Sequence, residues 1–319
     1  MKKYGSLLLV LAVLFTQFTF VANGASPNPV PLFQADEVHQ APSGITNYLL
    51  LCVDSWDSKA NNIGNTDGIV LVTLDEYAGR VILTSFLRDI LMQTENGKYA
   101  RMSRYVPHYG ANQKAVEDFI TLHERHFGID IHHYVVVDWQ MIRNIIDAVG
   151  GVSVHLTQGE AIRLRSKNAF KSEWASPYLT KDAGQYILNG EAAVYYMRIR
   201  SGTPVEGETY DFRRTSRVRL VLESIAQALV NITFEQAQAI LDVVVNNTLM
   251  TNMSAVDLLS ATQKAYASLG TPIEQFRIPM ENTYENFTYA GGASIQIDYP
   301  VNRMSLYEYL YGSFVVRDE

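Results

Sequence analysis

The sequence predicts an α/β protein in which helices are layered against a sheet. Short apolar runs rich in β-branched residues predict buried strands over Tyr48–Val53, Gly68–Leu74 and Val81–Phe86. The turn Leu74–Gly79 is placed to join the second and third runs as a hairpin. Farther along, a strand–helix–strand pattern covers residues 133–156, which is typical of layered α/β sheets.

Helical spacing of apolar residues accounts for much of the remaining chain. It predicts a helix over Asn112–Phe127, and Asp138 is placed to cap a second helix that Gly150-Gly151 ends. The later part of the chain is predicted to form a loop or lid over Thr157–Ala183, helices over Asn189–Met197, Phe212–Val230, Phe234–Val245 and Ala255–Leu269 (capped by Ser254), strands over Gln275–Pro279 and Ser294–Ile297, and a last helix capped by Asn302.

The amino terminus is typical of an export signal. Two lysines precede an apolar stretch over residues 6–21, and small residues follow it. We interpret residues 1–25 as a signal peptide or an N-terminal anchor, and the sequence leaves its cleavage open. The proline-rich residues 26–44 are predicted to be a flexible linker, and residues 45–319 a single domain. We therefore expect an exported protein, either membrane-associated or secreted to the cell envelope.

Composition narrows the class of protein. Apolar residues make up 47% of the 319-residue chain, enough for a sizeable core. The formal net charge of −7 argues against non-specific binding of nucleic acid.

Cys52 is the only cysteine and lies in an apolar run, so it is predicted to be a buried strand residue and no intramolecular disulfide can form. Four histidines between residues 123 and 133 lack a zinc-site pattern, and we assign them to a solvated helix face and the start of a strand.

Two aspartates mark the ends of predicted strands. Asp54 ends the first strand and Asp67 precedes the second, so a hairpin would bring them to one edge of the sheet. Magnesium prefers oxygen ligands and commonly combines one or two carboxylates with substrate phosphates. The alternative is that both residues only form turns.

Arginines recur after predicted strands and at helix ends. Arg88 follows the third strand and could bind phosphate with Asp89 beside it, although a surface ion pair is the alternative. Arg198 and Arg200 would share one face if the segment after the helix is extended. Arg214 and Arg217 lie three positions apart on a predicted helix, where they either contact phosphates or face solvent.

The ordered set of these motifs resembles the LytR-CpsA-Psr family. The motifs are the strand-end aspartate, the aspartate before the second strand, R-D after the third, D-A-V-G-G-V, L-N-G-E-x-A-x-x-Y-x-R-x-R, and D-F-x-R-T-x-R. The match covers a core over residues 47–222 and leaves residues 223–319 as a carboxy-terminal extension. The resemblance implies an α-β-α fold with a central mixed sheet flanked by helices.

The resemblance also implies a function. Family members transfer a glycopolymer phosphate from a polyprenyl-pyrophosphate carrier onto peptidoglycan, with the lipid in an apolar tunnel and a magnesium or manganese ion at the pyrophosphate. Asp89 would orient Arg88 or act as the base toward the acceptor hydroxyl. By position, the metal would be held by Asp54 and Asp67, and the pyrophosphate by Arg88, Arg198, Arg200, Arg214 and Arg217.

This chain departs from the family pattern at several positions. Trp56 and Asn65 stand where the family usually has arginines, and Leu87 replaces a proline. A lysine-then-asparagine element appears as Arg101 and Ser103. The sequence therefore leaves two alternatives open beside the transferase: a pyrophosphatase acting on the same lipid-linked glycans, and a binding protein for them without catalysis. The glycopolymer, the acceptor and the oligomeric state are not determined. For a transferase, we expect Arg88→Ala or Arg198→Ala to abolish activity with little loss of thermal stability.

Overall fold

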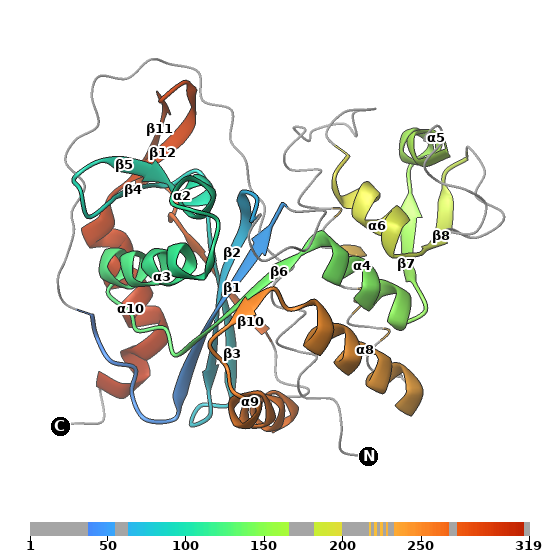
Figure 1. The fold of residues 1–319 in the computed structure, drawn as a ribbon, viewed down its shortest axis with the longest axis horizontal. Coiled ribbons are helices and arrows are strands. Elements are labelled where there is room, and N and C mark those ends of the chain that lie inside the picture. Colours follow the sequence, from blue (N-terminus) through green and yellow to red (C-terminus); the bar gives the residue numbers. More distant parts are fainter. Residues whose placement is uncertain are drawn as a thin grey trace.

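A mixed six-stranded sheet forms the centre of the molecule (Figure 1). The computed structural model describes residues 38–54, 63–165, 182–199, 233–267 and 273–315, together with residues 217, 220, 221, 224, 225 and 228. The strands lie in the order β10 (Ile273–Ile278), β3 (Arg80–Phe86), β2 (Thr66–Asp75), β1 (Ile45–Val53), β6 (His133–Asp138) and β9 (Met250–Thr251).

The pairing directions confirm a mixed sheet. β1, β2 and β3 form an antiparallel meander, and the predicted hairpin turn joins β2 to β3. β6 is parallel to β1, and β10 is parallel to β3. Every residue of β1 and β2 is buried, because helices cover both faces of the sheet.

Helices form a layer on each face of the sheet, as the α-β-α prediction requires (Figure 1). α2 (Met102–His108), α3 (Gln113–Phe127) and α10 (Tyr299–Val315) lie on one side. α4 (Trp139–Ala148), α6 (Gly190–Met197) and α8 (Phe234–Asn247) lie on the other. α9 (Ala255–Ala267) lies near the start of β1, where Lys264 Nζ donates to Thr46 Oγ1 at 2.8 Å.

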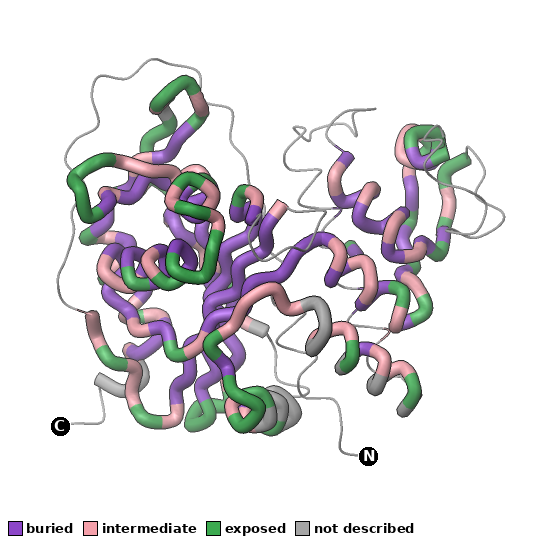
Figure 2. Tube along the Cα trace, viewed as in Figure 1, coloured by how far each residue is buried: buried purple, intermediate pink, exposed green. Residues whose placement is uncertain are grey.

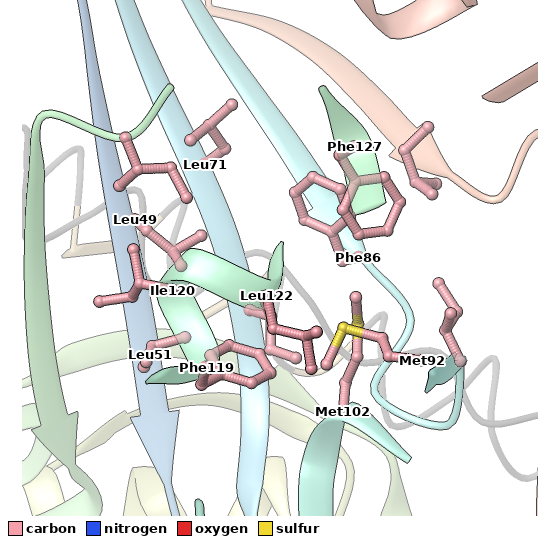
Figure 3. Close-up of a cluster of buried hydrophobic side chains, with 14 of the residues drawn as sticks. Leu49, Leu51, Leu71, Phe86, Met92, Met102, Phe119, Ile120, Leu122 and Phe127 are labelled. Carbon is pink, nitrogen blue, oxygen red and sulfur yellow. The ribbon is translucent and has the colours of Figure 1, made fainter. Parts of the chain in front are cut away.

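Alternation along β1 divides its side chains between two cores. Leu50 and Cys52 pack toward α4 and α6, whereas Leu49 and Leu51 pack toward α2, α3 and α10. Figure 2 shows the buried strands as a continuous purple band. Figure 3 shows the second core, in which aromatic rings of β3 and α3 meet methionines from β4 (Leu91–Gln93) and α2.

In the described part of the chain, three antiparallel pairs of strands lie outside the central sheet. β4 pairs with β5 (Tyr99–Arg101), and β11 (Tyr284–Tyr289) pairs with β12 (Gly292–Ile297). β7 (Val152–Leu156) pairs with β8 (Gly184–Leu188). The strand–helix–strand unit predicted over residues 133–156 therefore ends in a separate two-stranded sheet, since β7 does not join the central sheet.

The helix caps predicted at Asp138 and Ser254 are confirmed. Asp138 accepts from the backbone N–H of Met141, and Asn112, which was not predicted as a cap, accepts from that of Ala115. Ser254 Oγ accepts from the N–H of Asp257 at 3.2 Å. These bonds satisfy N–H groups that a helix start leaves without partners.

Two sequence-based predictions are wrong, one for the segment after β7 and one for the start of the last helix. The loop expected over Thr157–Ala183 contains α5 (Gln158–Arg165), because Thr157 and Glu160 form a reciprocal capping box. Asn302 does not cap α10, which begins at Tyr299 and is capped by Asp298, whose Oδ1 accepts from Val301 at 3.1 Å. Pro300 is tolerated in the first helical turn, so the helix starts one turn earlier than predicted.

The described chain begins within the predicted linker. His39 donates its backbone N–H to the carbonyl of Gly128 at 3.0 Å, and Ala41 donates to Asp130 Oδ1 at 2.9 Å. The last residues of the predicted linker are therefore bound to the domain and are not a flexible tether. The predicted signal segment, residues 1–25, lies outside the described residues. Among the helices that are described, none combines the length and apolar character of a membrane span.

Candidate functional site

The sheet topology brings the predicted aspartates and one arginine to the same edge. β1 and β6 are parallel, so Asp54, which follows β1, lies beside Asp138 at the end of β6. β2 is antiparallel to β1, so its start, with Asp67, lies at this edge too. β3 ends here as well, and Arg88 follows two residues later.

A β-bulge distinguishes Asp67 from its neighbours. Cys52 pairs with Gly68 and Val53 pairs with Thr66, so Asp67 is the extra residue of β2. Bulges re-aim side chains and are frequent beside active sites. Just beyond it, Asp54 donates its backbone N–H to the carbonyl of Asn65 at 2.8 Å. The bulge therefore holds the two predicted metal-binding residues on adjacent chain segments.

Arg88 is fixed by the carboxylates on either side of it. Its Nη1 donates directly to Asp67 Oδ1, and its Nε lies 3.6 Å from Asp89 Oδ2. Burial opposes the charge, but Asp67 and Asp89 together hold the pKa of Arg88 above its ordinary value. Its Nε is buried beside Asp89, and the side chain as a whole is 21% exposed, so an anion would reach the outer N–H groups of the guanidinium.

Asp89 is a carboxyl group with a raised pKa. Burial raises its pKa and Asp67 adds to this effect, while Arg88 and Arg101 oppose it. A carboxylate whose proton affinity is raised in this way is better suited to accept a proton than an exposed aspartate. This property agrees with the base role implied by the family resemblance, and it does not distinguish that role from the orientation of Arg88.

Arg198 forms the second arginine–aspartate pair. It is the C-cap of α6, and its Nη2 donates to Asp54 Oδ1 at 3.2 Å. Its guanidinium carbon lies 5.5 Å from the centre of the Trp139 ring. Trp139 directly follows Asp138 and was not predicted as a site residue; an aromatic residue after a strand-ending aspartate was its only signal.

Of the remaining predicted arginines, Arg217 is the one that the structure describes. Arg217 is buried, and its Nε donates to Glu160 at 2.6 Å while its Nη1 donates to the carbonyl of Ile199 at 2.7 Å. These contacts tie α5 to the chain segment that follows Arg198. The role of Arg217 as a phosphate ligand stays a prediction. Arg200 and Arg214 lie outside the described residues.

Cys52 has the buried position that the sequence predicted. Burial raises the pKa of its thiol, and the nearby carboxylates of Asp67, Asp138 and Asp54 raise it further. The thiol therefore stays protonated and is a poor nucleophile.

Two of the predicted surface histidines are buried in the second core instead. His123 is packed among phenylalanines, and His126 accepts from the N–H of Gln93 at 3.1 Å. Apolar spacing on α3 includes these two positions, and histidine is amphipathic enough to occupy them. The prediction of a solvated helix face is wrong for both.

Among the described residues, Asp54 and Asp67 are the carboxylates placed to contribute to a divalent cation site. Asp54 and Asp67 supply carboxylate oxygens, and each has one oxygen engaged by an arginine. In the part of the chain that the structure describes, no three His, Cys, Asp or Glu side chains are grouped to bind a metal ion. Magnesium bound by one or two carboxylates completes its shell with water and phosphate oxygens, so the pair fits a metal that arrives with a phosphorylated substrate.

The fold and this site define an α/β protein with paired arginines and aspartates at one sheet edge. The chain belongs to the LytR-CpsA-Psr family, whose sequence profile (LytR_cpsA_psr family) matches residues 23–304.

Two named bacterial proteins are similar to this chain in sequence. It is 25% identical over 203 residues to a protein of Oceanobacillus iheyensis named polyisoprenyl-teichoic acid–peptidoglycan teichoic acid transferase TagU; the match covers 63% of this chain and 57% of that protein. It is 26% identical over 185 residues to biofilm regulatory protein A of Streptococcus mutans; the match covers 57% of this chain and 43% of that protein. The chain thus spans about half the length of these relatives.

Solved structures share the fold. The structure of TagT bound to LIIa-WTA has a TM-score of 0.59 and 17% identity, and the match covers 89% of this chain and 98% of that one. This likeness confirms the layered fold with its central mixed sheet.

Proposed function

We propose that the protein transfers a glycopolymer phosphate from a polyprenyl-pyrophosphate carrier onto peptidoglycan at the cell envelope. The observation that supports this most is the pair of arginine–aspartate contacts, Arg88 with Asp67 and Arg198 with Asp54, at one sheet edge. Relatives named as teichoic acid transferases point to the same reaction.

The site suits phosphoryl transfer because such reactions need positioning and charge neutralisation more than covalent chemistry. The acceptor hydroxyl oxygen would bond to the glycan-bearing phosphorus. The bond from that phosphorus to the bridging oxygen would break, and polyprenyl phosphate would leave. Arg88 and Arg198 would neutralise charge on the phosphate oxygens, and Asp89 would accept the proton of the hydroxyl.

Asp54 and Asp67 are the residues that would hold magnesium or manganese. When bound, such an ion would supply positive charge that offsets the negative charge of the phosphate oxygens. The same aspartates already orient the arginines, so the carboxylates would serve two functions. The apolar tunnel for the lipid and the phosphate roles of Arg200, Arg214 and Arg217 remain parts of this proposal.

The test is transfer of labelled glycan phosphate from a polyprenyl-pyrophosphate donor onto peptidoglycan fragments, with and without magnesium. We expect labelled peptidoglycan with the metal and a strong decrease after chelation. Release of glycan phosphate without an acceptor would instead identify a pyrophosphatase. Binding of the donor with neither product would identify a binding protein.

The proposal includes an envelope location, with the protein exported and facing the membrane surface that holds its lipid-linked donor. Fractionation of cells expressing the full chain tests this part separately. We expect the protein in the envelope or the medium, and recovery in the cytosol would contradict it.

A further inference from the structure

A basic pocket lies beside the arginine–aspartate site, between α2 and the hairpin of β11 and β12. Its volume is about 390 Å³, within the range of small-molecule sites. Its walls include Asn65, Tyr99, Arg101, Arg104, His108 and Tyr289.

Backbone hydrogen bonds join this pocket to the site. Ser103, in the first turn of α2, donates its N–H to the carbonyl of Arg88 at 2.8 Å. Ile295 of β12 donates its N–H to the carbonyl of Asp89 at 2.9 Å. The R-D pair thus supports both walls, and a ligand in the pocket lies next to the residues proposed to act on phosphate.

The positive charge of the pocket comes from two arginines at the start of α2. Arg101 ends β5 and is the N-cap of α2, Arg104 lies in the first turn of that helix, and both residues line the pocket. Burial and the charge of Arg104 lower the pKa of Arg101, while Asp89 opposes this change. Two guanidiniums placed close together in an acidic chain favour the binding of an anion.

The two arginines differ in how firmly they are held. Arg101 Nη1 donates to the carbonyl of Ala293 at 3.2 Å, so the β11–β12 hairpin fixes its direction. Arg104 is exposed, and no described residue forms a hydrogen bond or an ion pair with it. Arg104 therefore keeps its full set of donors for a ligand.

Aromatic walls add affinity for a ring. Tyr99 and Tyr289 lie on neighbouring hairpins with ring centroids 6.1 Å apart, and both line the pocket. Tyrosines combine apolar ring faces with a polar hydroxyl, which suits the mixed surface of a sugar. Asn65, where the sequence departs from the family pattern, adds an amide to the same wall rather than a charge.

We propose that this pocket binds an anionic sugar, with Arg104 and Arg101 as ligands of its phosphate or carboxylate group. The choice of a saccharide rests on the proposed function, while the anion preference rests on the pocket itself. A phosphate would come from the glycopolymer donor, and a carboxylate from the peptidoglycan acceptor. Arg104 would then determine which glycan is accepted.

The test is calorimetric titration of the full chain with N-acetylglucosamine 1-phosphate, N-acetylmuramic acid and neutral N-acetylglucosamine. We expect at least one charged sugar to bind about tenfold more tightly than the neutral one. Arg104→Ala should weaken that binding about tenfold, and Arg104→Lys should weaken it less. Dependence on Arg104 for the sugar phosphate alone would identify the donor as the source, and for muramic acid alone, the acceptor.

Matched variants make the result specific. Lys98→Ala removes one charge from the exposed turn of the β4–β5 hairpin, outside the pocket, and should change affinity less than twofold. Binding that survives in Arg104→Ala but disappears in Arg88→Ala would assign the probe to the site already described and overturn the proposal. Equal binding of the neutral sugar would also overturn it.

These readouts are independent of turnover. Arg104-dependent binding without any transfer by the wild type would reject the proposed function and leave the pocket standing. Transfer by the wild type, combined with sugar binding that does not depend on Arg104, would support the proposed function and reject the role of the pocket.

Discussion

The arginine–aspartate site and the neighbouring pocket use arginine in different ways. Arg88 and Arg198 are each held by a carboxylate at the end of a buried sheet. Arg104 is exposed and has no described partner. A guanidinium held in place is already positioned for developing charge, whereas a free one adapts to different ligands. The difference assigns chemistry to the first region and recognition to the second.

Loss of Arg88 should give the largest effect. Arg88→Ala should decrease transfer by roughly 100-fold or more, because it removes a fixed positive charge from the phosphates. It should also lower stability by about 1–3 kcal/mol, since Asp67 is left buried without its cation. The structure thus changes the sequence-based expectation of an unaffected melting temperature for this residue.

Two comparisons control this result. Arg88→Ala combined with Asp67→Asn should recover much of the stability and none of the transfer, as measured by denaturant unfolding and product formation. Arg198→Ala should lose transfer with a smaller stability cost, because its side chain and that of Asp54 are 32% and 30% exposed. Wild-type transfer by Arg88→Ala would contradict a catalytic role for the site.

Asp89 should control the pH dependence of the reaction. Its pKa is raised, chiefly by burial, so a base at this position loses activity as pH falls toward that raised value. Asp89→Asn should decrease transfer about 100-fold and remove the acid limb of the rate profile. An acid limb that persists in this variant would assign the base to another group and leave Asp89 to orient Arg88.

Acid should weaken the core that supports the site rather than the pocket. Burial lowers the pKa of His123 to about 3 and that of His126 to about 4, against 6.5 for the free side chain. The unfolded chain therefore binds more protons than the folded one between pH 6.5 and about 4. The free energy of unfolding should therefore decrease as the pH is lowered across this window, by up to about 1.4 kcal/mol per pH unit for each histidine.

A substitution at His123 checks that assignment. Both ring nitrogens of His123 are buried without a described hydrogen-bond partner, and Phe86, Phe119 and Phe127 pack against the ring. His123→Phe should therefore retain stability at neutral pH and reduce its loss on acidification, as followed by melting temperature. An unchanged slope between pH 6.5 and 4 would exclude His123 as a source.

Gly292 offers a milder change in the pocket. A Cβ on Gly292 would lie 2.1 Å from Arg101 Nη1, at the flexible end of that side chain. Gly292→Ala should displace Arg101 and weaken binding of the charged sugar several-fold, with little loss of stability. Gly312→Ala is the matched control, because nothing lies within 4 Å of its added Cβ. Equal affinities in the two variants would show that Arg101 is not a ligand.

The sequence predicted the sheet and the site at different levels of detail. Apolar runs were sufficient for β1, β2 and β3, since continuous burial leaves a strong pattern. β4, β5 and α2 were missed because they are three to seven residues long and carry little periodicity. The pocket was missed with them.

Within the site, spacing suggested that Asp54 and Asp67 meet, but not how. The bulge that makes Asp67 the extra residue of β2 depends on strand register, which the sequence pattern does not fix. The sequence also did not predict the carboxylate with which each arginine pairs. Arg217, for example, pairs with Glu160, which is 57 positions away, and only the folded chain brings the two together.

The central claim is that the paired arginines and aspartates catalyse phosphoryl transfer to peptidoglycan. The most direct measurement is single-turnover transfer of glycan phosphate from a polyprenyl-pyrophosphate donor onto peptidoglycan fragments, comparing wild type with Arg198→Ala at matched, verified folding. We predict covalently labelled peptidoglycan from the wild type and at least a 100-fold slower reaction from the variant. Equal rates from both proteins, or no labelled peptidoglycan from the wild type, would contradict the claim.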